Sequence, residues 1–279
     1  MKVELHSGQE ILKAQLQIGK KDDGFLICHG FGGSIYEPEE SSVAADLAAR
    51  NYTTMIVSHK TGGRFDLIFQ DQVRQLIDAV TYMLKEIHMK RVHLFGISMG
   101  ASNALVASAM DGRIASAASS SGIMDCEIWL KGLLKRDFER FVSDLAAYEV
   151  SLLKGERKSS PLFKVADLLE GGRDATKSRT KIRGRTTKVS VRTIRSMLTY
   201  KPIISARGIS GKPVYFFHGT NDQLVPHSHT LEMYKAVRAR KRKILIRGGG
   251  HEMILDESIR RRITTSYLRW LREDNLLEE

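Results

Sequence analysis

The stretch Gly96-Ile97-Ser98-Met99-Gly100 decides the predicted fold of this chain. An apolar run, 92–95, precedes it, and a run of mostly small residues, 101–109, follows it. A strand, a Gly-x-Ser-x-Gly turn and a helix in that order form a nucleophile elbow, which presents a serine hydroxyl on a sharp, strained turn. This order predicts that Ser98 is the nucleophile of an acyl-transfer enzyme.

The five-residue pattern alone is weak evidence. Gly and Ser each make up roughly 7% of residues in proteins, so Gly-x-Ser-x-Gly occurs by chance in about one chain of this length in ten. The alternative is a loop that happens to contain two glycines. The elbow interpretation has a physical basis, because side chains at positions 96 and 100 would collide with the neighbouring strand and helix.

Length and composition describe an ordinary soluble chain. Its 279 residues, 42% hydrophobic and 27% charged, suit one large α/β domain or a domain with an insertion. No apolar run is long enough to span a bilayer, and the first residues lack the apolar region of a signal peptide. Cys28 and Cys126 are too few for a disulfide framework. We therefore expect a cytoplasmic protein without a transmembrane segment.

Strand-like and helix-like runs alternate along most of the chain. This alternation predicts a mostly parallel sheet with helices on both faces, the α/β class, and places the loops that follow the strands at one edge, where sites form. Strands are expected at 11–18, paired in a hairpin with 3–5, and at 25–28, 53–57, 92–95, 114–119, 214–217 and 243–246, and helices at 43–49, 73–87, 227–238 and 254–270.

The alternation stops between 123 and 206. Apolar spacing from Ile128 to Tyr148 predicts one long amphipathic helix, followed by a short helix at 165–169 and a helical piece that ends near Leu198. We interpret 123–206 as an inserted, mainly helical cap, or lid. The α/β core would then comprise 1–122 and 207–279.

Two residues that follow later strands can complete a catalytic triad with Ser98. A serine nucleophile needs a base, usually histidine, held by an acid. Asp222 follows the strand 214–217, and His251 follows the strand 243–246 after three glycines. Asp222 could equally be a turn residue and His251 a helix cap. Their order and their common edge of the sheet favour the triad.

Three other histidines compete with His251 for the role of base. His218 ends the strand before Asp222, so we expect it to support the loop that carries the acid. His227 and His229 begin a helix, where we expect them to be exposed.

Acyl transfer also needs donors for the developing oxyanion, each worth roughly 3–4 kcal/mol. The glycine-rich segment 29–34 follows the strand 25–28 and can turn backbone N–H groups toward the edge of the sheet. We assign the two donors to the backbone N–H groups of Phe31 and Met99. The phosphate-binding glycine motifs are absent, and no His/Cys cluster has metal-ligand spacing, so we expect neither a cofactor nor a metal.

Five residues are placed by their sequence positions near the same edge, and we predict that they contact the substrate: Gly30, Ile123, Met124, Leu224 and Val225.

Four motifs together resemble the α/β-hydrolase superfamily: His-Gly-Phe-Gly-Gly at 29–33, the elbow at 96–100, Gly219 to Pro226, and Gly250-His251. The chain is most similar to capped microbial serine carboxylesterases, including feruloyl (hydroxycinnamoyl) esterases and monoacylglycerol-lipase-like enzymes, over 20–122 and 207–272. The resemblance implies Ser98 as nucleophile, Asp222 as acid and His251 as base, with Phe31 and Met99 as oxyanion donors.

One loop departs from that family pattern. Many relatives carry an Asp-x-x-Gly-His-Gly turn after the second parallel strand, whereas this chain has Ser-His-Lys-Thr-Gly-Gly-Arg at 58–64. That loop can reach the site, so the substrate preference of a relative does not carry over.

The net charge of +12 is concentrated in one stretch. Residues 173–195 contain nine basic residues and one acid, a net +8. Two interpretations remain open: a solvated loop, or a collar that attracts anionic substrates or an anionic surface. The stretch lacks aromatic residues for base stacking, so no nucleic-acid partner is expected.

These features predict a serine hydrolase that cleaves carboxylic esters through a Ser-His-Asp triad and an acyl-enzyme. Its substrate would be a small-molecule ester, with anionic and aromatic esters both open. A thioesterase of the acyl-CoA type, an amidase or a peptidase could use the same triad, and a non-catalytic binding module could keep the fold. An epoxide hydrolase or dehalogenase is disfavoured, because those enzymes need a carboxylate at the elbow.

Overall fold

The computed structural model describes residues 1–59, 66–155, 163–164 and 188–277. These residues form two compact units. The first unit comprises 1–60, 70–124 and 201–279, and the second comprises 61–69 and 125–200, each as far as it is described.

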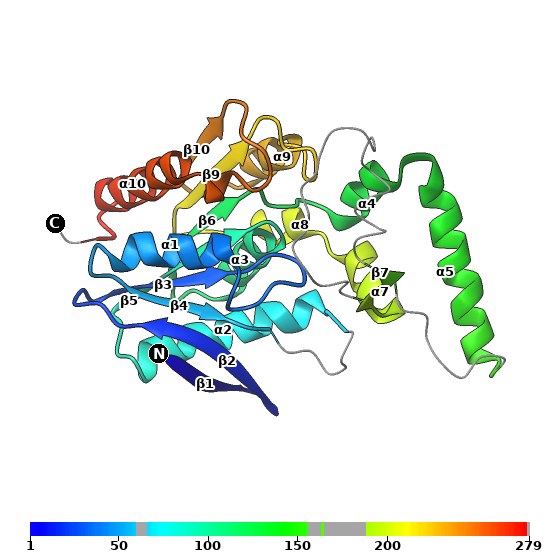
Figure 1. The fold of residues 1–279 in the computed structure, drawn as a ribbon, viewed down its shortest axis with the longest axis horizontal. Coiled ribbons are helices and arrows are strands. Elements are labelled where there is room, and N and C mark those ends of the chain that lie inside the picture. The colour runs from blue at the N-terminus through cyan, green and yellow to red at the C-terminus, as the bar shows by residue number, and fades with distance from the viewer. Residues whose placement is uncertain (60–65, 156–162, 165–187, 278–279) are drawn as a thin grey trace. The chain divides into compact units, whose positions relative to one another are not determined.

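The first unit contains an eight-stranded sheet in the order β1-β2-β4-β3-β5-β6-β9-β10 (Figure 1). β1 and β2 form an antiparallel hairpin, β2 also runs antiparallel to β4, and the remaining neighbours are parallel. The predicted α/β class and the hairpin are therefore confirmed. The strands are β1 (Lys2–Ser7), β2 (Glu10–Gln17), β3 (Asp23–Cys28), β4 (Thr53–Val57), β5 (Arg91–Ile97), β6 (Ile114–Ser120), β9 (Val214–Gly219) and β10 (Lys241–Ile246).

Helices cover both faces of this sheet. α1 (Pro38–Ala48) and α10 (Glu257–Glu273) pack together on one face (Figure 1). α3 (Met99–Met110), α8 (Pro202–Ala206) and α9 (Ser228–Ala236) cover the other face. α2 (Phe69–Lys85) is tied to α3, since the Asn103 amide donates to Gln72 Oε1 at 2.9 Å.

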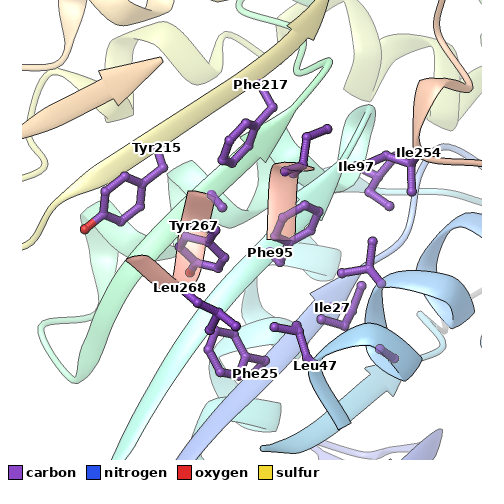
Figure 2. Packing of buried hydrophobic residues seen from close by; sticks show 14 of the residues in the cluster. Phe25, Ile27, Leu47, Phe95, Ile97, Tyr215, Phe217, Ile254, Tyr267 and Leu268 are labelled. Carbon is purple, nitrogen blue, oxygen red and sulfur yellow. The ribbon is translucent and has the colours of Figure 1, made fainter. Parts of the chain in front are cut away.

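The alternating side chains of each strand separate two hydrophobic clusters. Phe25 and Tyr215 face α1 and α10, whereas Val214 and Phe216 face α3 and α9. Figure 2 shows the first cluster, with Tyr267 of α10 surrounded by strand residues. The Tyr267 ring lies 5.3 Å from that of Tyr215, and its hydroxyl lies 3.0 Å from Ser116 Oγ, in a fully buried position.

The order of the strands creates a point at which the connections diverge. From β3 the chain crosses through α1 to β4 on one side, and then through α2 to β5 on the other side of β3. Loops that leave β3 and β5 therefore separate at their carboxyl ends, and ligands of open α/β sheets bind in the crevice at such a point.

The second unit contains α4 (Cys126–Leu134), the 3-10 helix η1 (Lys135–Asp137), α5 (Phe138–Leu153), α7 (Val191–Thr199) and a short antiparallel pair, β7 (Phe163–Lys164) with β8 (Lys188–Val189). Side-chain caps start two of these helices: Asp125 accepts from the backbone of Glu127 at 2.9 Å, and Ser190 accepts from that of Thr193 at 3.3 Å.

The prediction of one helix from Ile128 to Tyr148 is wrong. The chain breaks at Lys135, which has φ of +50°, and resumes as α5. Apolar residues continue at helical spacing on both sides of the break, so the periodicity of the sequence does not reveal it. The predicted helix at 254–270 also needs correction: η2 (Met253–Leu255) comes first, and α10 starts after Asp256, whose carboxylate caps it.

Two further sequence predictions lie outside the described residues. These are the short helix at 165–169 and most of the basic stretch 173–195. Among the helices that the structure describes, none has the length and apolar character needed to cross a membrane.

Two substitutions at Tyr267 should separate the contribution of its ring to stability from that of its hydroxyl. We expect Tyr267→Phe to lower the free energy of unfolding by about 1 kcal/mol, because the Ser116 hydroxyl keeps His93 as a partner. Tyr267→Ala should cost about 3–5 kcal/mol, because it leaves a cavity in the first cluster. Urea denaturation followed by circular dichroism measures both, and equal losses would contradict this assignment.

Candidate active site

Ser98 lies on a strained turn between β5 and α3. Its φ is +55° and ψ is −122°, a conformation that residues other than glycine rarely adopt. Its backbone N–H donates to the carbonyl of Ser120, at the end of β6, at 2.8 Å. The turn is thereby fixed at the carboxyl ends of two adjacent strands, and backbone strain of this kind is typical of functional positions.

The two glycines of the elbow permit contacts that a side chain would prevent. A Cβ at Gly100 would lie 2.1 Å from the carbonyl oxygen of Cys28, at the end of β3. A Cβ at Gly96 would lie 2.4 Å from the backbone of Ala101. The first turn of α3 therefore packs directly on the backbone of β3, as the sequence pattern anticipated.

The loop that follows β3 lies against Ser98. A Cβ at Gly30 would be 3.4 Å from the Ser98 Cβ, in ordinary contact. The Gly30 carbonyl accepts from the backbone N–H of Gly33 at 3.1 Å and from His29 Nδ1 at 2.9 Å. Residues 30–33 thus form a closed turn beside the serine. We call this turn, which contains the predicted oxyanion donor Phe31, the oxyanion loop.

A continuous chain of hydrogen bonds joins Ser98, His251 and Asp222. His251 Nε2 lies 3.0 Å from Ser98 Oγ, and His251 Nδ1 lies 2.8 Å from Asp222 Oδ2. A carboxylate can only accept, so Nδ1 carries the proton and donates it to Asp222. In the neutral ring Nε2 is then an acceptor, and Ser98 Oγ–H donates to it.

Asp222 is held in its ionised form by four donors. The backbone N–H groups of Leu224 and Val225 donate to Oδ1 at 3.0 and 2.8 Å. His251 and His218 donate to Oδ2 at 2.8 and 3.2 Å. Burial alone would raise the pKa of Asp222, but these hydrogen bonds, from His218 and His251 above all, bring it well below its usual range.

Close backbone contact brings the loops of Asp222 and His251 together. A Cβ at Gly219 would lie 2.1 Å from the carbonyl oxygen of Gly249. That carbonyl also accepts from the backbone N–H of Asn221 at 2.9 Å. The loop after β9 is therefore tied to the loop after β10, which fixes the spacing between the acid and the histidine.

The surroundings of His251 favour its protonated form. Burial alone would lower the pKa of His251, but the hydrogen bond to Asp222 and the charges of Asp222, Glu39 and Glu252 raise it. Its side chain is 16% exposed, so it remains accessible while its acid partner is fully covered. Such a histidine can take a proton from Ser98 and hold it.

The other predicted site residues occupy several positions. Met99 is the first residue of α3, and Phe31 is half-buried in the oxyanion loop. Val225 is buried, and Leu224 is half-buried. Ile123 is buried and its backbone is held by Ser102, with hydrogen bonds of 2.8 and 2.9 Å; Met124 is half-buried and packs against the second cluster.

Two of the three rival histidines, His218 and His229, make structural contacts. His218 Nε2 donates to the carbonyl of Val225 at 2.8 Å as well as to Asp222, and its Nδ1 lies 2.7 Å from Thr230 Oγ1. The expected exposure of His229 is wrong: this residue is buried, and its Nδ1 accepts from the backbone N–H of Met124 at 3.3 Å. His227 is half-buried.

Two acidic residues near the site were not predicted from the sequence. Glu39 and Glu40 begin α1 after Pro38, and each has a buried carboxylate oxygen without a hydrogen-bond partner among the described residues. The acidic run after the glycine-rich segment was the available signal. Acidic residues in a first helical turn ordinarily balance the helix dipole at the surface, which hides a buried role.

The described residues contain no group of three or more His, Cys, Asp or Glu side chains arranged to hold a metal ion. Burial raises the pKa of the thiols of Cys28 and Cys126, which stay free and protonated.

The family model described as the alpha/beta hydrolase fold matches residues 24–258. This chain therefore belongs to the α/β-hydrolase fold family. No curated protein sequence matches it.

Solved structures of esterases and hydrolases share this fold. The α/β hydrolase GrgF from Penicillium is 17% identical, with a TM-score of 0.79 and 98% of each chain covered. Est1E from Butyrivibrio proteoclasticus is 20% identical, with a TM-score of 0.71 and 98% of each chain covered. An esterase of Pyrococcus furiosus is 15% identical, with a TM-score of 0.69 over 98% of this chain and 90% of the other.

The elbow should tolerate no side chain at position 100. We expect Gly100→Ala to lower the free energy of unfolding by roughly 2 kcal/mol or more, because the added methyl meets the rigid backbone of β3. Gly112→Ala is the matched control: nothing lies within 4 Å of its Cβ, and its effect should stay within about 0.5 kcal/mol. Thermal and urea unfolding measure both, and a Gly100→Ala variant as stable as the wild type would contradict the close packing of α3 on β3.

Proposed function

We propose that this protein is a serine hydrolase that cleaves carboxylic esters through an acyl-enzyme. The observation that carries the proposal is the hydrogen-bond chain from Ser98 Oγ through His251 to the ionised Asp222, with the serine on a strained turn. Membership of the α/β-hydrolase fold family and esterases among its structural neighbours support a hydrolase.

The proposed reaction needs only groups that this site contains, plus the ester and water. Ser98 Oγ attacks the ester carbonyl carbon while its proton passes to His251 Nε2. The tetrahedral intermediate collapses, and the alcohol leaves with that proton. Water then gives a proton to His251 and attacks the acyl carbon, and Ser98 recovers its proton as the acid departs. Asp222 remains ionised and stabilises the imidazolium.

The developing oxyanion would be stabilised by the backbone N–H groups of Phe31 and Met99. Met99 opens α3, so its N–H belongs to the helix N-terminus, where negative charge is favoured. Phe31 belongs to the loop that touches Ser98. Each donor would be worth roughly 3–4 kcal/mol.

We further propose that 123–206 is an inserted, mainly helical cap, or lid. This insertion starts after β6, at the carboxyl edge of the sheet, which is also the edge of the elbow. Together with Gly30, Leu224 and Val225, the first residues of the insertion, Ile123 and Met124, would contact the substrate.

Ser98→Ala should abolish ester hydrolysis without unfolding the protein. We expect kcat/KM to fall by roughly 10³-fold or more, because no other group supplies the attacking oxygen. The variant should also lose covalent labelling by a fluorophosphonate. Ser258→Ala, at an exposed position on α10, is the matched control.

A panel of nitrophenyl esters, a hydroxycinnamoyl ester, acyl-CoA thioesters and amides would define the substrate class. The hydroxycinnamoyl ester is included because Est1E has been solved with ferulic acid bound. Full activity of Ser98→Ala on any of these would contradict the proposed nucleophile.

The rate should depend on the protonation of His251. Since its pKa lies above the ordinary value of 6.5, kcat/KM should fall as pH decreases through a midpoint above 6.5. Asp222→Asn removes the hydrogen bond and charge that raise this pKa, so the midpoint should move to lower pH and the rate should drop. Rates measured from pH 5 to 8 test this, and a flat profile would count against His251 as base.

A further inference from the structure

A buried carboxyl group of α1 holds the backbone of the oxyanion loop. Glu40 is only 2% exposed, and its Oε1 accepts from the backbone N–H of Gly30 at 3.3 Å. Its other oxygen, Oε2, is buried and has no hydrogen-bond partner among the described residues. A carboxylate would normally need several donors at such a position, so the neutral acid suits it better.

Hydrogen bonds hold Gly30 at both its N–H group and its carbonyl group. Glu40 accepts a hydrogen bond from the Gly30 N–H, while Gly33 N–H and His29 Nδ1 donate to the Gly30 carbonyl. The peptide bond that joins Gly30 to Phe31 is planar and trans, so the Phe31 N–H points opposite to the Gly30 carbonyl. Fixing Gly30 therefore fixes the direction of the N–H group assigned as an oxyanion donor.

We propose that Glu40 is a positioning residue of the oxyanion loop, and that it supports ester hydrolysis only while its carboxyl group is neutral. This inference rests on the proposed function of Ser98. A neutral carboxyl orients Gly30 without adding charge. An ionised carboxyl at the same place would put a negative charge beside the loop that must receive the negative oxyanion, in surroundings where water does not screen it.

Burial, together with the titratable groups around it, keeps Glu40 protonated near neutral pH. Burial, followed by the charge of Glu39, raises the pKa of Glu40 to about 8. Glu37 precedes α1 and adds to this effect. Burial also raises the pKa of Glu39 to about 7, although the charge of His251 opposes that rise.

The neighbouring elements contribute further titratable and charged groups. Cys28 of β3 is a protonated thiol, and burial lowers the pKa of His29, which stays neutral. The loop before η2 contributes His251 and the acidic Glu252, both of which act on Glu39. On α10, Arg260 is paired with Asp46 of α1 at 3.2 Å. β4 contributes no titratable side chain.

The proposal predicts a second limb in the pH profile. The acid limb belongs to His251, and the rate should fall again, about tenfold, as pH rises through the pKa of Glu40 near 8. If no buried acid lay behind the oxyanion loop, the rate would instead reach a plateau at alkaline pH.

Three substitutions test the assignment with activity profiles from pH 5 to 10. Glu40→Gln keeps an acceptor for Gly30 but cannot ionise, so the alkaline limb should disappear and the variant should exceed the wild type about tenfold at pH 10. Glu40→Leu removes the acceptor and should lower kcat more than it changes KM at every pH. Glu39→Gln removes a like charge and should move both limbs to lower pH. Glu86→Gln, at an exposed position, is the matched control and should leave both limbs in place.

An infrared measurement makes the test independent of turnover. A protonated-carboxyl band that is present at pH 6, lost through about pH 8 and missing in Glu40→Gln would identify the neutral Glu40. Absence of that band, or an alkaline limb that persists in Glu40→Gln, would overturn the proposal. If the band is present but the wild type hydrolyses no ester and resists the fluorophosphonate, the proposed function fails and the positioning role fails with it.

Discussion

The contact between the first turn of α3 and the end of β3 is the constraint on which the site depends. Gly100 has no Cβ, so the backbone of α3 can approach the carbonyl of Cys28 closely. A Cβ at this position would lie only 2.1 Å from that carbonyl oxygen. The same turn contains Ser98 with its positive φ, and the Ser98 hydroxyl lies 3.0 Å from His251 Nε2. A single steric requirement thus accompanies both the strained backbone of Ser98 and the placement of its hydroxyl group beside His251.

The strand order converts that local turn into a site. β3 and β5 are adjacent, but their connections run in opposite directions across the sheet. The elbow after β5 and the oxyanion loop after β3 therefore face each other at the same edge. The loops after β9 and β10 arrive from the other side, tied together by the contact of Gly219 with Gly249, and bring Asp222 and His251 to Ser98.

The charges near the site are negative, whereas the net charge of the whole chain is positive. The chain carries +12, yet the charges that act on His251 come from Asp222, Glu39 and Glu252, all acidic. They favour an imidazolium, which the proposed reaction forms transiently, and disfavour ionisation of the nearby buried carboxyls. The distribution of charge at the site, and not the net charge, therefore governs how acids and bases behave there.

The sequence by itself determined the α/β class, the hairpin, the elbow and the identity of the three residues that meet in the hydrogen-bond chain. It could do so because strand ends, glycines and chain order are local properties that the sequence displays directly. The apolar periodicity did not predict the helix break at Lys135, because the apolar spacing continues across the break and only the positive φ of this residue reveals it. It also misplaced the start of α10, which the cap at Asp256 fixes.

Only the tertiary structure decided which polar groups lose contact with water. Glu39 and Glu40 look like the surface acids of a first helical turn, and His229 looks like an exposed residue at a helix start, yet all three carry buried polar atoms or side chains in the folded chain. Burial depends on elements far apart in the sequence, here α1 packing on β3 and on the segment after His251. The pKa values near the site follow from that packing, and no local pattern of residues encodes them.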